Sequence, residues 1–231
     1  MSPEKCIDFS LTKLSRDRPF GSYSKIQVLY SRLIRGKRFQ LNKLKNNGKH
    51  YLNVACGDKA HPDFINLDYQ WRPRVELCWD ITKGLPFIAR SIKGIFIEHC
   101  LEHLMYSQCC GLLEEFRRVL QPGGVVRIVV PDAELYLDLY QKSKRGEFVE
   151  FPYVNQQESQ NGITPMMSVN RVFRDHGHLF AYDAKTLEMM LRNAGFVDIR
   201  KESFRTGRDE NLMIDSEERK AESLYVEAAV T

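Results

Sequence analysis

The sequence predicts an α/β fold built around a buried, mostly parallel sheet. Three observations predict it. Short apolar runs alternate with amphipathic segments from residue 51 onward, which is the pattern of strands and crossover helices. One amphipathic segment ends at the helix stop Gln121-Pro122-Gly123-Gly124, which leads directly into an apolar run. Two final apolar runs lie on either side of a charged stretch, as in an antiparallel pair.

The expected strands are short apolar runs bounded by turn residues. In chain order they are 51–55 (YLNVA), 65–68 (INLD), 76–79 (ELCW), 92–98 (IKGIFIE), 125–130 (VVRIVV), 196–204 (FVDIRKESF) and 223–230 (SLYVEAAV). Only seven residues separate Gly57 from Ile65, and a helical crossover needs about 10–12. We therefore expect no helix between the first two strands.

The expected helices show apolar residues at helical spacing. They are 112–120 (LLEEFRRVL), 133–145 (AELYLDLYQKSKR) and 184–195 (AKTLEMMLRNAG), the last with Asp183 as its N-cap. Residues 146–180 carry prolines and polar side chains and predict a long surface insertion. Such insertions often determine specificity.

The length of 231 residues predicts one domain, residues 49–231, after a basic helical extension, residues 1–48. The first 50 residues hold twelve Lys and Arg against three Asp and Glu. Residues 26–34 have helical periodicity, and their basic face can contact an anionic membrane or nucleic acid, or be the solvated side of a helix packed on the domain.

We expect a cytoplasmic protein, because no apolar run is long enough to span a bilayer and no secretory signal is visible. The six cysteines form no CxxC pair and show no regular spacing. A zinc ribbon and a disulfide framework are therefore not supported, and we expect reduced thiols.

Candidate ligand-binding residues follow the expected strands, because a parallel sheet binds its ligand at the carboxyl ends of its strands. The first strand leads into the small-residue turn Ala55-Cys56-Gly57, which lets backbone amides approach a ligand. Asp68 ends the second strand and can accept both hydroxyls of a ribose. Asp80 follows the third and can accept from an adenine amino group while Ile81 covers the ring. Each signal alone is weak, and their order and spacing strengthen them.

In that order, the runs LNVACG, INLD, WDIT, IEHCLEHL and RRVLQPGGVVRIVVP resemble the class I S-adenosylmethionine-dependent methyltransferases. The resemblance covers roughly residues 50–230. It implies a Rossmann-like, seven-stranded sheet with the last strand antiparallel and helices on both faces. It also implies S-adenosylmethionine as the cofactor. The residues that it assigns to the cofactor are Asn53, Ala55, Cys56 and Gly57 for the methionine part, Asp68 for the ribose, Asp80 and Ile81 for the adenine, and the backbone of Glu98 and His99 beside the sulfonium.

The sequence departs from the family pattern at its start. The family usually has an acid where Asn53 stands and a glycine where Ala55 stands, so the cofactor ammonium loses a charged partner. The short first crossover resembles a branch of small predicted methyltransferases, methyltransferase type 11-like, that is often associated with surface-polysaccharide synthesis. Polysaccharide biosynthesis is the pathway which that likeness suggests.

A cluster of histidines and a carboxylate follows the fourth strand. In a helix, His99, Glu102 and His103 would share one face at positions i, i+3 and i+4. Two nitrogens and a carboxylate can hold a divalent metal, with His178 as a fourth ligand. Two other interpretations stay open: Glu102 caps a helix under the cofactor and the histidines are hydrogen-bonded, or a histidine accepts the acceptor's proton without a metal.

Further candidates near the acceptor are less specific. Asp132 follows the fifth strand, and His176 lies close to His178. From the insertion, Met166, Met167, Arg171 and Phe173 can line an acceptor pocket, although core packing explains any one of them equally well.

The leading functional hypothesis is an O-directed methyltransferase acting on a small molecule, sugar or lipid-linked glycan. No Asn/Asp-Pro-Pro-aromatic run follows the fourth strand, and that run is the usual mark of enzymes that methylate nucleobase amino groups. One alternative is an RNA methyltransferase that uses the basic extension. Another is a non-catalytic regulatory or scaffolding protein, suggested by Asn53 and Ala55. A nicotinamide-dependent dehydrogenase is disfavoured, because the first turn lacks GxGxxG.

Overall fold

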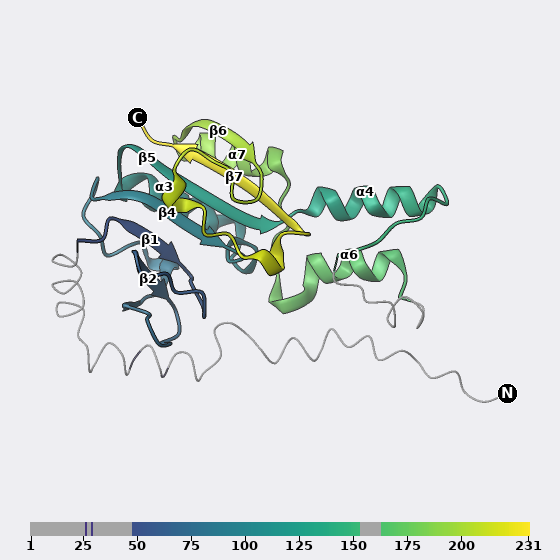
Figure 1. Ribbon diagram of the computed structural model, residues 1–231, viewed down its shortest axis with the longest axis horizontal. Helices are drawn as coiled ribbons and strands as arrows, with labels where there is room; N and C mark the ends of the chain where they lie inside the picture. The colour runs from purple at the N-terminus through teal and green to yellow at the C-terminus, as the bar shows by residue number, and fades with distance from the viewer. Residues whose placement is uncertain (1–25, 27–28, 30–47, 153–162) are drawn as a thin grey trace.

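The computed structural model describes Ile26, Leu29 and residues 48–152 and 163–231. A seven-stranded sheet forms its centre, in the order β3-β2-β1-β4-β5-β7-β6 (Figure 1). The strands are β1 (Tyr51–Val54), β2 (Phe64–Asp68), β3 (Leu77–Cys78), β4 (Ile92–Glu98), β5 (Leu120–Pro131), β6 (Val197–Glu202) and β7 (Ser223–Ala229). Only β7 runs against its neighbours, because it pairs antiparallel with both β5 and β6. The predicted α/β fold with an antiparallel last strand is confirmed.

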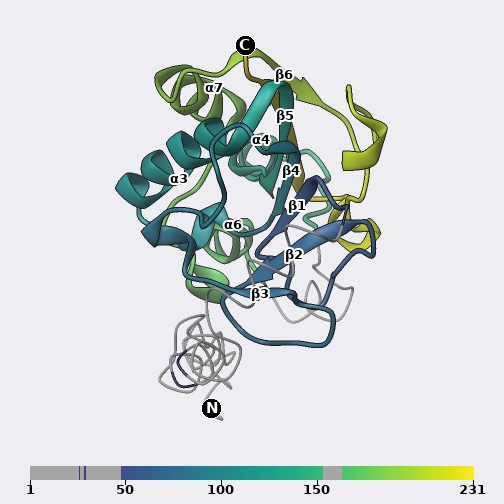
Figure 2. The same ribbon diagram turned by 90° about the vertical axis from the view of Figure 1, so that its left-hand side faces the viewer.

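Two helices, α3 (Tyr106–Val119) and α7 (Ala184–Asn193), lie on one face of the sheet, and the chain between β6 and β7 covers the opposite face (Figure 2). That connection contains the 3-10 helices η4 (Glu210–Leu212) and η5 (Glu217–Arg219). Side chains alternate along the central strands as a period of two requires. On β5, Val126 and Ile128 face the core under the helices, whereas Val125 and Val129 face the second cluster with Leu212.

The helix stop predicted at Gln121-Pro122-Gly123-Gly124 lies inside a strand. Helix α3 ends at Val119, and β5 begins at once at Leu120, so the stop lies within the strand rather than before it. A Cβ on Gly124 would lie 2.8 Å from the carbonyl oxygen of Gln121 and 2.9 Å from that of Lys93. Only glycine fits this close backbone approach.

The first crossover contains no helix, as its length predicts. A turn and short loop lead from β1 to β2, and amide side chains hold the loop together. Asn66 accepts a 2.8 Å hydrogen bond from the backbone nitrogen of His61 and donates one of 2.8 Å to the carbonyl oxygen of the same residue. These bonds replace the support that a crossover helix would give.

The described residues of the predicted insertion, 146–180, include a helix that packs on the helix predicted at 133–145. Helix α4 (Ala133–Lys144) packs along α6 (Pro165–Arg174), and the pair extends from the carboxyl end of β5 (Figure 1). Val169 and Val172 of α6 are buried against Tyr136 of α4. Residues 146–180 were predicted to be a surface insertion because of their prolines, polar residues and few periodic signals. Val169 and Val172, three residues apart, share the face of α6 that packs on α4, and Tyr140, Phe151 and Phe173 complete this cluster.

The basic extension predicted for residues 1–48 lies outside the described residues, apart from Ile26, Leu29 and Gly48. Among the residues that the structure does describe, no helix combines the length and the apolar character needed to cross a membrane.

Candidate functional site

The turn after β1 and the end of β2 are joined by a hydrogen bond. Ala55 and Gly57 have positive φ angles of 56° and 54°, which folds the chain back over the strand ends. The backbone nitrogen of Gly57 donates to Oδ2 of Asp68 at 2.8 Å, and that of Gln70 donates to Oδ1 at 2.7 Å. Asp68 is therefore held rigidly at the carboxyl end of β2, next to the turn. Cys56, within the turn, is buried against Val75 and Cys78, and burial raises the pKa of its thiol to about 12.

Asn53, predicted to bind the methionine part of the cofactor, lies on β1, and its buried side chain faces the loop that replaces the crossover helix. Its Nδ2 donates to the carbonyl oxygen of Lys59 at 2.9 Å and to Oδ1 of Asn66 at 3.2 Å. Both amide protons are thus used inside the protein. A carboxylate at this position could donate neither bond, which explains why an amide stands here.

Asp80 and Ile81 lie just beyond β3. Asp80 caps the 3-10 helix η1 (Ile81–Lys83), where its Oδ1 accepts from the backbone nitrogen and the hydroxyl of Thr82 at 3.2 and 2.6 Å. Ile81 is 8% exposed and packs in the main core. Asp68 and Asp80 therefore lie at the ends of adjacent strands, as the sequence predicts.

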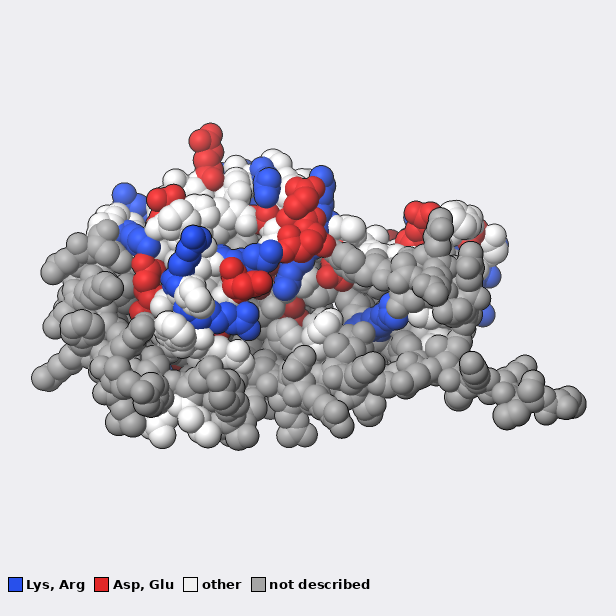
Figure 3. Space-filling model, turned by 60° about the horizontal axis from the view of Figure 1, so that its bottom comes forward, with Lys and Arg blue, Asp and Glu red and all other residues white. Residues whose placement is uncertain are grey.

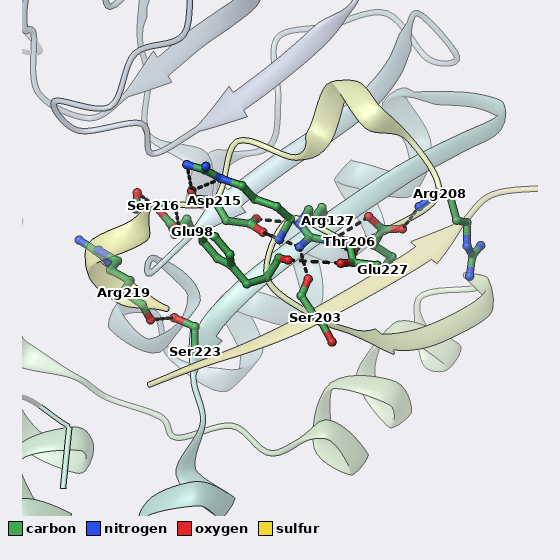
Figure 4. Close-up of polar contacts among 12 residues, drawn as sticks. Glu98, Arg127, Ser203, Thr206, Arg208, Asp215, Ser216, Arg219, Ser223 and Glu227 are labelled. Carbon is green, nitrogen blue, oxygen red and sulfur yellow. Dashed lines mark hydrogen bonds and ion pairs between the residues drawn. The ribbon is translucent and has the colours of Figure 1, made fainter. Parts of the chain in front are cut away.

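Glu98 ends β4, and His99 follows it in a left-handed conformation with a φ angle of 47°. The carboxylate of Glu98 accepts from the backbone nitrogen of Ser216 at 2.9 Å and from its hydroxyl at 2.5 Å (Figure 4). The backbone nitrogen of His99 donates to the carbonyl oxygen of Val129 at 2.8 Å. The chain therefore turns sharply after β4 and directs the His99 side chain toward β7.

The imidazole of His99 has one defined partner on β7. Its Nε2 lies 2.8 Å from Oγ of Ser223, and the Ser223 hydroxyl donates its own proton to the carbonyl oxygen of Arg219 at 2.7 Å. Ser223 can then only accept from His99, so Nε2 of His99 carries the proton and Nδ1 is unprotonated. That Nδ1 lies 3.7 Å from Oε1 of Glu102 and 3.9 Å from Oε1 of Glu222.

The segment after His99 forms a short 3-10 helix, η2 (Leu101–His103), rather than the start of a long helix. The carbonyl oxygen of Glu102 accepts from the backbone nitrogens of Leu179 and Phe180 at 2.7 and 3.2 Å. This contact brings His178 against His103, with ring centroids 4.9 Å apart. The structure thus places Glu102, His103 and His178 together, although they come from segments about 75 residues apart in the sequence.

These residues line a cavity of about 660 Å³ at the carboxyl ends of β4 and β5. The walls come from η2, from the α4–α6 pair and from the chain after η4. The lining residues are His99, Glu102, His103, Tyr136, Pro152, Ser168, Arg171, Val172, His176, His178, Glu218, Arg219 and Glu222. The four residues predicted to be catalytic are therefore all in the wall of one cavity.

Burial sets the charge of the cavity wall. It lowers the pKa of His99 to about 2 and that of His103 to about 4, and it also lowers the pKa of His178. It raises the pKa of Glu102 to about 8. Desolvation disfavours the charged form of each group, so the three imidazoles are neutral at pH 7.

Of the less specific candidates, His176 and Arg171 line the cavity. Asp132 instead caps α4, where Oδ1 accepts from the backbone nitrogen of Glu134 at 3.1 Å. Phe173 packs with the small cluster between α4 and α6, and Met166 is 44% exposed. The sulfur of Met167 accepts from the backbone nitrogen of Thr164 at 3.5 Å.

The sequence analysis missed the segment that forms one cavity wall, namely Glu218, Arg219 and Glu222. It also missed what fixes that segment: Arg127 on β5, which is wholly buried with Asp215 and Glu227. A signal was available. Arg127 and Glu227 each interrupt an apolar run, VVRIVV and YVEAAV, and a charge in a buried strand needs a partner of opposite sign.

The strand order and the antiparallel β7 agree with the Rossmann-like, seven-stranded sheet that the resemblance in the sequence implies. A family model described as a methyltransferase domain matches residues 37–128, which include β1 to β4, α3 and most of β5. No curated protein matches the chain.

The solved structures that match this chain are distant in sequence. They include a SAM-dependent methyltransferase from Archaeoglobus fulgidus, 16% identical with a TM-score of 0.49, where the match covers 87% of this chain and 98% of that one. A possible exported protein from Bordetella parapertussis is 14% identical with a TM-score of 0.47, and the match covers 84% of this chain and 66% of that one. Phosphoethanolamine N-methyltransferase 2 of Haemonchus contortus is 13% identical with a TM-score of 0.44, and the match covers 99% of this chain and 61% of that one. The chain thus spans less than two thirds of the last two proteins.

Proposed function

We propose that this protein transfers a methyl group from S-adenosylmethionine to an oxygen of a small acceptor, such as a sugar or lipid-linked glycan, bound in the cavity beside His99. The position of the cavity carries the proposal. It begins at His99, directly after β4, while the candidate cofactor residues follow β1, β2 and β3 at the same edge of the sheet. In open α/β sheets, ligands bind in the crevice at this edge.

The residues present fit the cofactor with one exception. Asp68 is fixed by two backbone amides and keeps lone pairs for the ribose hydroxyls. A Cβ on Gly57 would meet nothing within 4 Å, so the outer side of the turn is open to a ligand. Asp80 and Ile81 follow β3, where the adenine would lie. Asn53 does not fit the role expected of it, because its amide protons bind Lys59 and Asn66.

When bound, S-adenosylmethionine would supply a methyl group on a positively charged sulfur, and this sulfur would keep the electron pair of the C–S bond when the methyl carbon bonds to the acceptor oxygen. The chain's own contribution is to hold the acceptor in line and to exclude water, which accounts for much of the acceleration in such transfers. A hydroxyl acceptor must also lose its proton. His103 and His178 line the cavity as candidate proton acceptors.

The size of the cavity supports a small acceptor, because pockets of about 300–1,000 Å³ are typical of small-molecule sites. The rival acceptor is RNA, which would require a basic surface. On the face shown in Figure 3, the described Lys and Arg side chains are interspersed with Asp and Glu rather than gathered into one basic stripe. Among the described residues visible on this one face, the distribution favours the small acceptor.

Calorimetry with S-adenosylmethionine, S-adenosylhomocysteine and NAD tests cofactor binding. We expect both sulfur ligands to bind and NAD not to bind; no heat from either sulfur ligand at millimolar concentration would overturn the proposal and favour a non-catalytic protein. Asp68→Asn should weaken binding about 10- to 100-fold, because hydrogen bonds to a charged group contribute about 1.5–3 kcal/mol. Asp63→Asn, at an exposed position just before β2, is the matched control and should bind like the wild type.

Methyl transfer is tested with radiolabelled S-adenosylmethionine against hydroxylated small molecules, glycolipid extracts and total RNA. We expect label in the small-molecule or glycolipid fraction as an alkali-stable ether. Label in RNA, with binding that weakens steeply as salt increases, would replace this proposal with the RNA alternative.

A further inference from the structure

The carboxylate of Glu102 is buried without a partner in the part of the chain that the structure describes. Glu102 is 2% exposed, and neither Oε1 nor Oε2 accepts a hydrogen bond there. A buried carboxylate without compensation is costly, and nearly all buried polar groups in proteins have a partner. Because the Glu102 side chain lines a cavity, a ligand bound in the cavity can be the missing partner of the carboxylate.

Two imidazoles face the same carboxylate. Nε2 of His103 lies 3.9 Å from Oε1 of Glu102, and Nδ1 of His103 is buried without a hydrogen bond among the described residues. Nδ1 of His178 lies 2.7 Å from the carbonyl oxygen of Val172, to which it must donate. The proton of neutral His178 is therefore on Nδ1, and Nε2 has a free lone pair. Fixing one ring nitrogen on a carbonyl is the usual support of a metal-binding histidine.

We propose that Glu102, His103 and His178 bind one divalent transition-metal cation at the wall of the cavity. One ligand atom from each residue lies within 4.8 Å of the other two. Ligands at 2.0–2.2 Å from a tetrahedral metal are about 3.4 Å apart, so small side-chain rotations close the set. Two nitrogens and one carboxylate suit zinc, cobalt, iron or manganese, whereas magnesium and calcium prefer oxygen ligands.

The structure changes the ligand set that the sequence suggests. His99 was expected to join Glu102 and His103 as a ligand. Its Nδ1 does lie 3.7 Å from Oε1 of Glu102, but His99 does not belong to the group whose ligand atoms all lie within 4.8 Å of one another. Three protein ligands leave at least one coordination position, and the cavity is the open side of the cluster.

The role of the cation rests on the proposed function. A cation in this position would occupy the lone pairs of His103 and His178, so these two residues would no longer accept the acceptor's proton. The cation would instead bind a hydroxyl oxygen of the acceptor and lower its pKa, so that the proton leaves to water and the electron pair stays on oxygen. The acceptor class would then be one with a metal-binding hydroxyl. An amine that is protonated at neutral pH would be a poor acceptor for such a site.

Cation binding can be measured without any methyl transfer. The tag-free chain of 231 residues is treated with chelator, dialysed and titrated with Co²⁺, and binding is followed by visible absorption and calorimetry. We expect one equivalent of Co²⁺ to bind and to give the visible absorption bands of a four- or five-coordinate ion. Zn²⁺ should compete with Co²⁺ for the site, and Mg²⁺ should not. Failure of the wild type to bind Co²⁺ or Zn²⁺ would overturn the proposal.

Variants identify the ligands. Glu102→Gln and His178→Gln should each weaken Co²⁺ binding at least about 100-fold, because each removes one of three ligands. His50→Gln, at an exposed position outside the cavity, should bind like the wild type. Thermal unfolding of each chelated variant shows whether it is folded, and unchanged Co²⁺ affinity in both folded ligand variants would also overturn the proposal. Because S-adenosylmethionine binding is measured separately in chelator, failure of the cofactor site and failure of the cation site are distinguishable.

Discussion

The guanidinium of Arg127 and the carboxylate of Asp215 form a two-point ion pair, with N···O distances of 2.7 and 2.6 Å, and neither side chain is exposed to solvent (Figure 4). Arg127 also donates to Glu227 and to the carbonyl oxygens of Ser203 and Thr206. The pair therefore attaches the connection between β6 and β7 to β5. Since that connection continues into Glu218, Arg219 and Glu222, the buried pair positions one wall of the cavity.

Asp215→Asn should lower the free energy of unfolding by about 3–5 kcal/mol, because it leaves the guanidinium in the interior with one charged partner fewer. The measurement is chemical denaturation. Asp198→Asn removes an exposed carboxylate that pairs with Arg200 and Arg208, and it should change stability by less than about 1 kcal/mol. Equal effects of the two substitutions would show that the buried pair does not fix the connection.

Asn53→Asp restores the acid that the family pattern usually has, yet we expect it to be harmful here. A carboxylate would face the carbonyl oxygen of Lys59 and Oδ1 of Asn66 with no proton to donate, at a position only 2% exposed. We predict a loss of about 2–4 kcal/mol in unfolding free energy. Asn193→Asp, at an exposed helix end, should cost less than about 1 kcal/mol. A stable Asn53→Asp variant with tighter cofactor binding would contradict this account.

The sheet could be predicted from the sequence because its signal is local. Runs such as IKGIFIE match β4 from end to end, and Asp183 marks the start of α7. The role of Asn53 could not be predicted, because it depends on Asn66, thirteen residues away and on the neighbouring strand. The cavity wall is a similar case. Glu222 lies in a charged stretch that looks like a plain connection, and only the burial of Arg127 and Asp215 brings that stretch to the site.

The hydrogen bonds of the Glu115 carboxylate should make the free energy of unfolding depend on pH. Its carboxylate accepts from Arg118 at 2.7 and 2.8 Å and from the backbone nitrogen of Leu85 at 2.6 Å, and the Arg118 hydrogen bonds lower its pKa in the folded state. A lowered folded pKa adds stability above the unfolded value near 4.5, and this is lost as pH falls through the folded pKa.

The comparison is between the wild type and Glu115→Gln. At pH 7 the wild type should be more stable by about 1–2 kcal/mol, and the difference should shrink steadily below pH 4.5. Denaturation series between pH 3 and pH 7 measure it. A difference that stays constant over this range would mean that the carboxylate charge contributes nothing.

The protonation of His99 can be observed directly. Because Ser223 donates to Arg219 and can only accept from His99, neutral His99 should carry its proton on Nε2. Burial lowers its pKa to about 2, so the ring should stay neutral throughout the folded range of pH. Nitrogen-15 NMR of labelled histidine distinguishes the tautomers.

Ser223→Ala removes the acceptor and should weaken the preference for Nε2, because Nδ1 can then donate to the carboxylates of Glu102 or Glu222, which lie 3.7 and 3.9 Å away. His50, exposed and outside the cavity, serves as the internal reference in the same spectra. A wild-type His99 protonated on Nδ1 would mean that Ser223 donates to the imidazole instead. The hydroxyl would then no longer donate to the carbonyl oxygen of Arg219, and the end of η5 would lose this hydrogen bond to β7.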